Sequence, residues 1–200
     1  PDVKSYILID YDSGMVIAEK NADLILPPAS ITKIMTSYII FTELQNETLA
    51  KNDYVLVSKK AWKTGGSKMF IEVGKKVKVS DLLQGIITSS GNDASVAMAE
   101  HISGDEETFS IYMNQLAENL GMVNTSYANS TGLPNDDLFT TARDISLLAR
   151  SLIKKFPDEY KLYSKKEYVY NEIKQYSRNK LLYLDVTVDG MKPGAIKNPE

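Results

Sequence analysis

The sequence predicts an α+β fold in one domain of 200 residues, and three observations lead to this prediction. Residues that favour strands gather near both ends of the chain, at 6–9 and at 168–188. Apolar residues recur at helical spacing through much of the middle. The composition is that of a globular protein, with 43% hydrophobic residues, 24% charged residues and a net charge of −3. We therefore expect an antiparallel sheet built from both chain ends, with an inserted helical lobe.

The first predicted elements are a hairpin and a core helix. Residues 6–9 and 15–18 are short β-prone runs, and turn-forming residues at 12–14 separate them. From residue 31 to residue 39, apolar side chains recur at helical spacing. This pattern predicts a buried helix whose first turn holds Ser30.

The rest of the chain is predicted to be mainly helical before it returns to strands. Residues 51–80 contain glycines and short Val-rich runs, which indicate small strands and loops. Helices are predicted from residue 81 to a break at 89–91, again after Asn92, over 105–120, and from 141 to just before Pro157. Strands are predicted at 168–170 and 181–188.

The composition excludes several classes of function. Cysteine is absent, which removes thiol catalysis, disulfides and Cys-ligated zinc. His101 is the single histidine and follows a helical run, so histidines and carboxylates do not occur at metal-ligand spacing and we expect no cofactor. Basic residues are scattered, which argues against a nucleic-acid partner. The sequence has no apolar run of the length that a membrane span needs.

A Ser-x-x-Lys pattern places Ser30 and Lys33 at positions i and i+3 of the predicted helix, where side chains share one face. A serine hydroxyl becomes a good nucleophile when a neighbouring base accepts its proton. Lysine acts as such a base when burial or nearby positive charge lowers its pKa. The backbone N–H of a serine at a helix start is also free to bind an oxyanion. The pattern is common by chance, so it carries weight only together with other motifs.

Two further segments follow at suitable places along the chain. Ser90 and Asn92 lie in the break between two predicted helices, from which a loop can project a hydroxyl and an amide into a cleft. Taken alone, this segment is typical of a turn. Near the end of the chain, Lys192 precedes Pro193 and a glycine. A Lys-Thr-Gly at residues 63–65 comes before Ser90, and we interpret it as a coincidence.

Together the three segments resemble the Ser-x-x-Lys, Ser-x-Asn and Lys-Thr-Gly motifs of penicillin-binding proteins and class A β-lactamases. The chain resembles most the low-molecular-mass penicillin-binding proteins, which are serine-type D-alanyl-D-alanine carboxypeptidases of the S11 kind. The resemblance runs almost from end to end. Its stretches are YILID at 6–10, PASITK at 28–33, SGND at 90–93, GLP at 132–134, TARD at 141–144 and RN at 178–179.

The resemblance implies a β-lactamase/transpeptidase-like fold, with residues 1–200 forming a single penicillin-binding catalytic domain. It implies an exported enzyme, periplasmic or on the outer face of the cytoplasmic membrane. The enzyme would remove the terminal D-alanine from peptidoglycan stem peptides through an acyl-enzyme and would be acylated by β-lactams. The implied catalytic residues are Ser30 as nucleophile, Lys33 as base and Ser90 as proton relay. The implied substrate-binding residues are Asn92, Arg178, Lys192, Gly194 and Ala195, the last supplying an oxyanion-hole N–H together with Ser30.

Two departures from the family pattern matter. Pro193 occupies the threonine position of the third motif, which removes a hydroxyl that would bind the substrate carboxylate. Proline is tolerated in a strand when its position faces the open edge.

The sequence ends at Glu200, and residues 195–200 do not resemble the family, which continues with two strands and a helix. We expect a domain that is incomplete at the C-terminus, with impaired turnover or with strands supplied by self-association.

Two alternative functions remain open. A class A β-lactamase needs a glutamate that directs the deacylating water, usually in a Glu-x-x-Leu-Asn segment. We find none between Asn92 and Lys192, and Gly91 stands where those enzymes favour aspartate.

The other alternative is a non-catalytic remnant that binds penicillin or peptidoglycan, which Pro193 favours. Slow acylation without peptide hydrolysis would favour this remnant.

Overall fold

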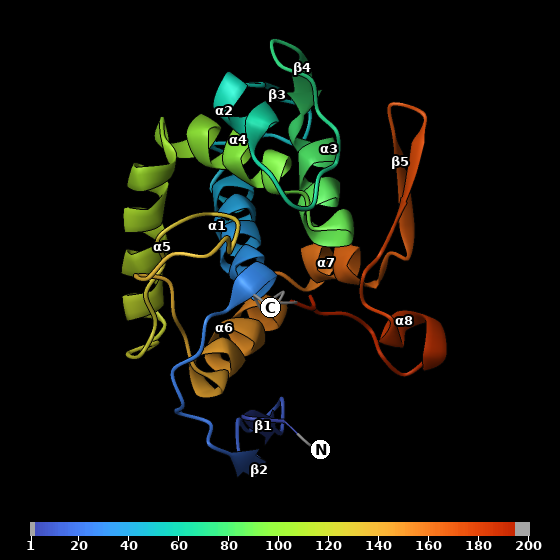
Figure 1. The fold of residues 1–200 in the computed structure, drawn as a ribbon. Helices are drawn as coiled ribbons and strands as arrows, with labels where there is room; N and C mark the ends of the chain where they lie inside the picture. Colours follow the sequence, from blue (N-terminus) through green and yellow to red (C-terminus); the bar gives the residue numbers. More distant parts are fainter. Residues whose placement is uncertain (1–2, 195–200) are drawn as a thin grey trace, which may run out of the picture.

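The computed structural model describes residues 3–194 as a helical body with three small antiparallel sheets of two strands each (Figure 1). The elements in chain order are β1 (Tyr6–Ile9), β2 (Val16–Lys20), the 3₁₀ helix η1 (Ala29–Thr32), α1 (Lys33–Gln45), β3 (Tyr54–Leu56), α2 (Lys59–Lys63), β4 (Lys76–Lys78), α3 (Val79–Gln84), the π-helix η2 (Gly85–Ser89), α4 (Asn92–Ser103), α5 (Glu106–Asn119), α6 (Ala142–Lys155), α7 (Pro157–Tyr160), the 3₁₀ helix η3 (Lys161–Ser164), β5 (Glu167–Tyr170), β6 (Ile173–Tyr176) and α8 (Leu181–Leu184). No helix in the described residues has the length and apolarity to cross a membrane.

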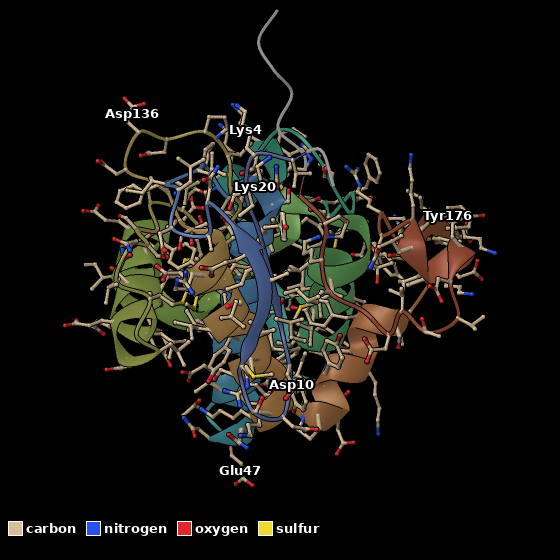
Figure 2. The ribbon with its side chains drawn as sticks, turned by 90° about the horizontal axis from the view of Figure 1, so that it is seen from below. Lys4, Asp10, Lys20, Glu47, Asp136 and Tyr176 are labelled. Atoms are coloured by element: carbon tan, nitrogen blue, oxygen red, sulfur yellow. The ribbon has the colours of Figure 1, made fainter. Side chains whose placement is uncertain are left out.

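The N-terminal hairpin is confirmed. β1 and β2 pair antiparallel with Tyr6 opposite Lys20, and the register shifts at Leu8 and Ile9. The hairpin packs on α6, and Figure 2 shows it lying across this face of the body, with Asp10 at one end and Lys20 at the other. The outward face keeps apolar side chains exposed, because the hairpin is covered on one side only.

The predicted core helix is also confirmed, and its burial is more complete than one apolar stripe requires. Every residue of α1 from Lys33 to Phe41 is buried. The helix runs through the centre of the body and contacts α4, α5, α6 and η2 (Figure 1). Such contacts on all sides explain why even its polar residues Thr36 and Ser37 are inaccessible to water.

The predicted break between two helices lies where the sequence placed it. The π-helix η2 ends at Ser89, and the next residue, Ser90, has a left-handed backbone (φ 61°, ψ 36°). Gly91 then leads into α4, the helix expected after Asn92. A left-handed residue ends the regular helical backbone, so Ser90 lies at the junction and Asn92 in the first turn of α4.

The C-terminal region corrects two expectations. Residues 181–188 do not form a strand; α8 begins there because Asn179 accepts the backbone N–H of Leu181 and donates to the carbonyls of Gly190 and Met191. These bonds curl the segment into a loop. The expected sheet from both chain ends is likewise not present in residues 3–194, where the N-terminal hairpin pairs only with itself.

The sequence prediction missed several short elements, among them β6 and α2. β6 pairs with β5, and its buried residue is Gln175, so polar and apolar residues do not alternate as a strand signal requires. The short helix α2 is capped by Ser58, which accepts the backbone N–H of Ala61. A helix of this length has too few residues to show a 3.6-residue period.

Candidate active site

Ser30 lies in η1, directly before the buried helix α1. The preceding residue Ala29 has a left-handed backbone (φ 47°), and the Ile31 N–H donates to the Pro28 carbonyl at 3.1 Å. This tight turn sets Ser30 one turn before Lys33, and the Lys33 Nζ lies 3.5 Å from the Ser30 Oγ. The structure thus brings together the predicted nucleophile and the predicted base.

The amine of Lys33 is fully buried and has two other, closer partners. Its Nζ donates to the Asn92 Oδ1 at 2.7 Å and to the backbone carbonyl of Thr131 at 2.6 Å. A neutral amine has two N–H groups and one lone pair. With both N–H groups bound to these acceptors, the lone pair is left for the hydroxyl of Ser30.

Lys33 is also poised electrostatically to act as a base. Burial is the main cause that lowers its pKa from 10.5 to about 7, because a charged amine is poorly solvated there. The positive charge of Arg178 lowers this pKa further, and the negative charge of Asp93 opposes the shift. Lys33 therefore loses its proton near neutral pH, as a general base must.

Asn92 is held so that its carbonyl oxygen faces Lys33. Its Nδ2 donates to the carbonyl of Gly65 at 2.7 Å, which leaves Oδ1 for the Lys33 amine. Gly66 lies so close that a Cβ there would come within 2.6 Å of the Asn92 Nδ2. The segment at residues 63–65 thus borders the site through the Gly65 carbonyl, a backbone contact that does not depend on the Lys-Thr-Gly pattern.

Asp93 is a buried residue to which the sequence analysis gave no role. Its carboxylate accepts the backbone N–H groups of Met69 and Phe70 at 2.9 Å and of Ile71 at 3.3 Å. Gln175 binds the same segment by donating to the Met69 carbonyl. Asp93 thus ties the segment 65–71 to the start of α4. The sequence signal was its place directly after the Ser-Gly-Asn motif.

Ser90 lies at the junction of η2 and α4 with its side chain buried. Its Oγ has no hydrogen-bond partner among the described residues. A buried hydroxyl without a partner carries a free-energy cost, which a bound ligand or a transferred proton can relieve.

The third motif lies beside η1. Lys192 is buried, and burial together with the positive charges of Lys33 and Arg178 lowers its pKa far below the usual value. Gly194 approaches so closely that a Cβ there would be 2.9 Å from the Ile31 Cγ1. Pro193 is exposed between them. Ala195 lies outside the described residues, so its predicted role stays a prediction.

Three cations contribute to the electrostatics of the site. The charge of Arg178 lowers the pKa of Lys33, and Lys33 and Lys192 repel each other, which lowers the pKa of Lys192. Arg178 is exposed in the loop after β6, and its neighbour Asn179 holds the backbone at Gly190 and Met191. Among the described residues, no group of three or more His, Cys, Asp or Glu side chains could hold a metal ion.

Comparison with known proteins gives the same picture. The family model for D-alanyl-D-alanine carboxypeptidases matches residues 2–198. The chain belongs to this family. Over 200 residues it is 44% identical to the D-alanyl-D-alanine carboxypeptidase DacC of Escherichia coli, and the alignment covers 96% of this chain and 50% of the relative. The chain therefore spans about half the length of the curated relatives it matches.

Two solved structures confirm the fold class. The enzyme DacD from Francisella tularensis superposes with a TM-score of 0.96 at 35% identity, over 98% of this chain and 60% of that one. Penicillin binding protein 5 from Haemophilus influenzae gives 0.94 at 40% identity, over 96% of this chain and 57% of that one. The fold is the α+β, β-lactamase/transpeptidase-like fold that the resemblance predicted.

Proposed function

We propose that the protein is a serine D-alanyl-D-alanine carboxypeptidase that removes the terminal D-alanine from peptidoglycan stem peptides. The observation that carries the proposal is the buried amine of Lys33, which is bound by Asn92 and Thr131 and lies 3.5 Å from the Ser30 Oγ. A serine with a desolvated base at this distance suits acyl transfer. Family membership specifies the acyl donor as a D-alanyl-D-alanine peptide.

The proposed reaction proceeds in two halves. The Ser30 Oγ attacks the carbonyl carbon of the terminal peptide bond while its proton passes to the Lys33 Nζ. The C–N bond then breaks, D-alanine leaves with a proton delivered through Ser90, and the acyl group stays on Ser30. In the second half, water loses a proton to Lys33 and attacks the ester carbonyl, which releases the shortened peptide and regenerates the Ser30 hydroxyl.

Charge complementarity supports an orientation in which the C-terminal carboxylate of the substrate points toward Lys192 and Arg178. The peptide ends in a carboxylate, and Lys192 and Arg178 are the cations beside the predicted base. Asn92 would bind the peptide amide, with Gly194 leaving room for the substrate backbone. The backbone N–H groups of Ser30 and Ala195 would bind the oxyanion. β-Lactams present a carboxylate and a strained amide in the same relation, so they should acylate Ser30.

A second candidate function is binding without turnover. Pro193 supports it, because the third motif lacks the hydroxyl and the backbone N–H that threonine would supply. Such a protein would still react with penicillin but would release D-alanine slowly or not at all.

The test is the intact mass of the protein after incubation with a penicillin. The parent should gain one penicillin per chain, Ser30→Ala should gain none, and Ser37→Ala, which also loses a buried hydroxyl from this region, should react like the parent. A folded parent without an adduct would refute the proposal. D-Alanine release from a D-Ala-D-Ala peptide then separates the two candidates, since the second predicts an adduct and no release.

The family's substrate also bears on location and partners. Peptidoglycan lies outside the cytoplasmic membrane, so we propose that the protein is exported, to the periplasm or to the outer face of that membrane. Self-association that completes the sheet stays a prediction, and the solution mass of the purified protein would test it.

A further inference from the structure

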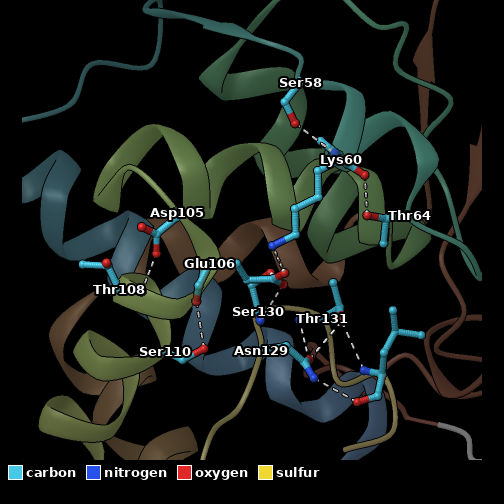
Figure 3. Close-up of polar contacts among 12 residues, drawn as sticks. Ser58, Lys60, Thr64, Asp105, Glu106, Thr108, Ser110, Asn129, Ser130 and Thr131 are labelled. Carbon is cyan, nitrogen blue, oxygen red and sulfur yellow. Dashed lines mark hydrogen bonds and ion pairs between the residues drawn. The ribbon is translucent and has the colours of Figure 1, made fainter.

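The carbonyl that binds Lys33 belongs to a turn that is anchored from outside the site. Glu106, in the first turn of α5, accepts the backbone N–H of Ser130 at 3.2 Å and its hydroxyl at 2.8 Å, both on Oε1 (Figure 3). Ser130 is fully buried and directly precedes Thr131, whose carbonyl receives the Lys33 amine. Glu106 thus binds the residue that directly precedes Thr131, and Thr131 in turn binds the predicted base.

The turn is held together by its own hydrogen bonds, so we expect a displacement of Ser130 to move Thr131 as well. Asn129 accepts the backbone N–H and the hydroxyl of Thr131 and the N–H of Gly132, and it donates to the Leu133 carbonyl. Figure 3 shows these bonds gathered around Asn129. A turn that is bonded internally moves as one body when its attachment changes.

Besides the bond from Lys33, the turn is attached to two helices through Ser130. The Thr36 hydroxyl on α1 donates to the Ser130 carbonyl at 2.7 Å, and Glu106 on α5 holds the Ser130 N–H and hydroxyl. The bonds to Glu106 add a second fixed point at Ser130, one residue before Thr131. Two fixed points restrict the direction of the Thr131 carbonyl more than one does.

We propose that Glu106 is a positioning residue for Lys33: it fixes the Thr131 carbonyl, so that the lone pair of the amine is directed at the Ser30 Oγ. This inference rests on the proposed acylation of Ser30. Glu106 touches neither substrate nor reacting atoms, and its effect passes through Ser130 and Thr131.

The position of the acceptor atom, and not the negative charge, is what the role requires. The other carboxylate oxygen, Oε2, pairs with Lys60 at 3.0 Å, and the Lys60 side chain is 57% exposed whereas that of Glu106 is 14% exposed. An ion pair with one solvated partner contributes little. Glutamine keeps an acceptor oxygen at Oε1 and loses only the charge, whereas alanine removes the acceptor.

The experiment compares Glu106→Gln and Glu106→Ala by stopped-flow acylation with a fluorescent penicillin. We expect Glu106→Ala to lower the first-order acylation constant about tenfold, the effect of one lost or misdirected hydrogen bond. The penicillin concentration at half-saturation should stay unchanged, because the groups that bind the ligand are untouched. Glu106→Gln should acylate like the parent, and so should Glu107→Ala, an exposed neighbour in the same turn.

Hydrogen exchange of residues 129–133 is measured on the same samples and needs no penicillin. Faster exchange in Glu106→Ala, with Glu106→Gln like the parent, supports the anchoring, and unchanged exchange overturns it. Ser130→Ala, which removes one of the two bonds, gives a second reading if Glu106→Ala does not fold. Equal slowing in the glutamine and alanine variants would also overturn the proposal. A parent that is not acylated would refute the proposed function, while the exchange result would still decide whether Glu106 anchors the turn.

Discussion

Gly132 lies directly against the peptide bond that joins Ala29 to Ser30. A Cβ at Gly132 would overlap the Ala29 carbonyl oxygen and would come within 3.0 Å of the Ser30 backbone nitrogen. Gly132 also has a left-handed backbone (φ 86°), which a side chain tolerates poorly. The turn whose Thr131 carbonyl binds Lys33 therefore also packs against the backbone of the predicted nucleophile, Ser30.

This contact predicts that Gly132→Ala costs both stability and acylation. The left-handed backbone accounts for about 1 kcal/mol and the overlap with Ala29 for about 2 kcal/mol more of the free energy of unfolding. Gly121 is the matched control, because it has a similar φ (78°) and open space around its Cβ position. Urea unfolding should show Gly121→Ala losing about 1 kcal/mol and still reacting with penicillin at the parental rate. Equal losses in both variants would contradict the contact.

The pKa of Lys33 predicts the pH dependence of acylation. Because burial lowers that pKa to about 7, the rate should rise with pH and reach half of its maximum near pH 7. The measurement is the first-order acylation constant between pH 5 and pH 9. A rate that still rises steeply at pH 9, without a plateau, would contradict the lowered pKa of Lys33.

Arg178 should lower the midpoint of that profile. Its positive charge disfavours protonation of Lys33, so Arg178→Gln should move the midpoint to higher pH. Stability should change little, because Arg178 is exposed. Lys180→Gln removes an exposed positive charge two residues further along the chain and should leave the midpoint in place. A shift of equal size in both variants would point to net charge as the cause.

Asp93 should have the opposite effect on the midpoint and a large effect on stability. Its negative charge raises the pKa of Lys33, so Asp93→Asn should move the midpoint to lower pH. The variant also weakens buried bonds to Met69 and Phe70, at a cost of about 2–3 kcal/mol in urea unfolding. Asp185→Asn is the control, since its carboxylate also accepts a backbone N–H but at an exposed position. A midpoint that stays at the parental value would contradict the electrostatic role.

Stability itself should rise with pH between 7 and 9. In this window the unfolded chain protonates Lys33 at its usual pKa, whereas the folded chain leaves it neutral, so unfolding takes up a proton. The slope from this group approaches about 1.4 kcal/mol per pH unit. Comparing Lys192→Met with the double variant Lys33→Met/Lys192→Met isolates it, because Lys192, whose own pKa responds to Lys33, is then absent from both proteins. Parallel curves for the two proteins would show that Lys33 does not titrate in this window.

Most of the fold was accessible from the sequence because its helices and its first hairpin carry strong local signals. The α1 repeat, the Thr141 cap of α6 and the break at Ser90 are encoded within a few residues. The region after residue 170 was less predictable. α8 depends on bonds that Asn179 makes to Gly190 and Met191, and such non-local partners leave no periodic pattern.

The candidate site divides in the same way. Ser30 and Lys33 share a helical face, so their proximity follows from spacing alone. The carbonyls of Thr131 and Gly65 also bind side chains of the site. Every residue has a backbone carbonyl, so the amino-acid type does not predict these contacts. Asp93 and Glu106 act on backbone N–H groups of distant segments, which only the folded chain brings into reach.

The burial of α1 also sets how the site can move. Lys33 stands at the head of a stretch buried through Phe41 and surrounded by other helices, so its amide should exchange with solvent only when the whole domain unfolds. The turn at 129–133 and the segment 65–71 are held by a few side-chain bonds each and can open at lower cost. Lys33 should therefore stay in place, and we expect adaptation to peptides or antibiotics of different shape to come from the two segments beside it.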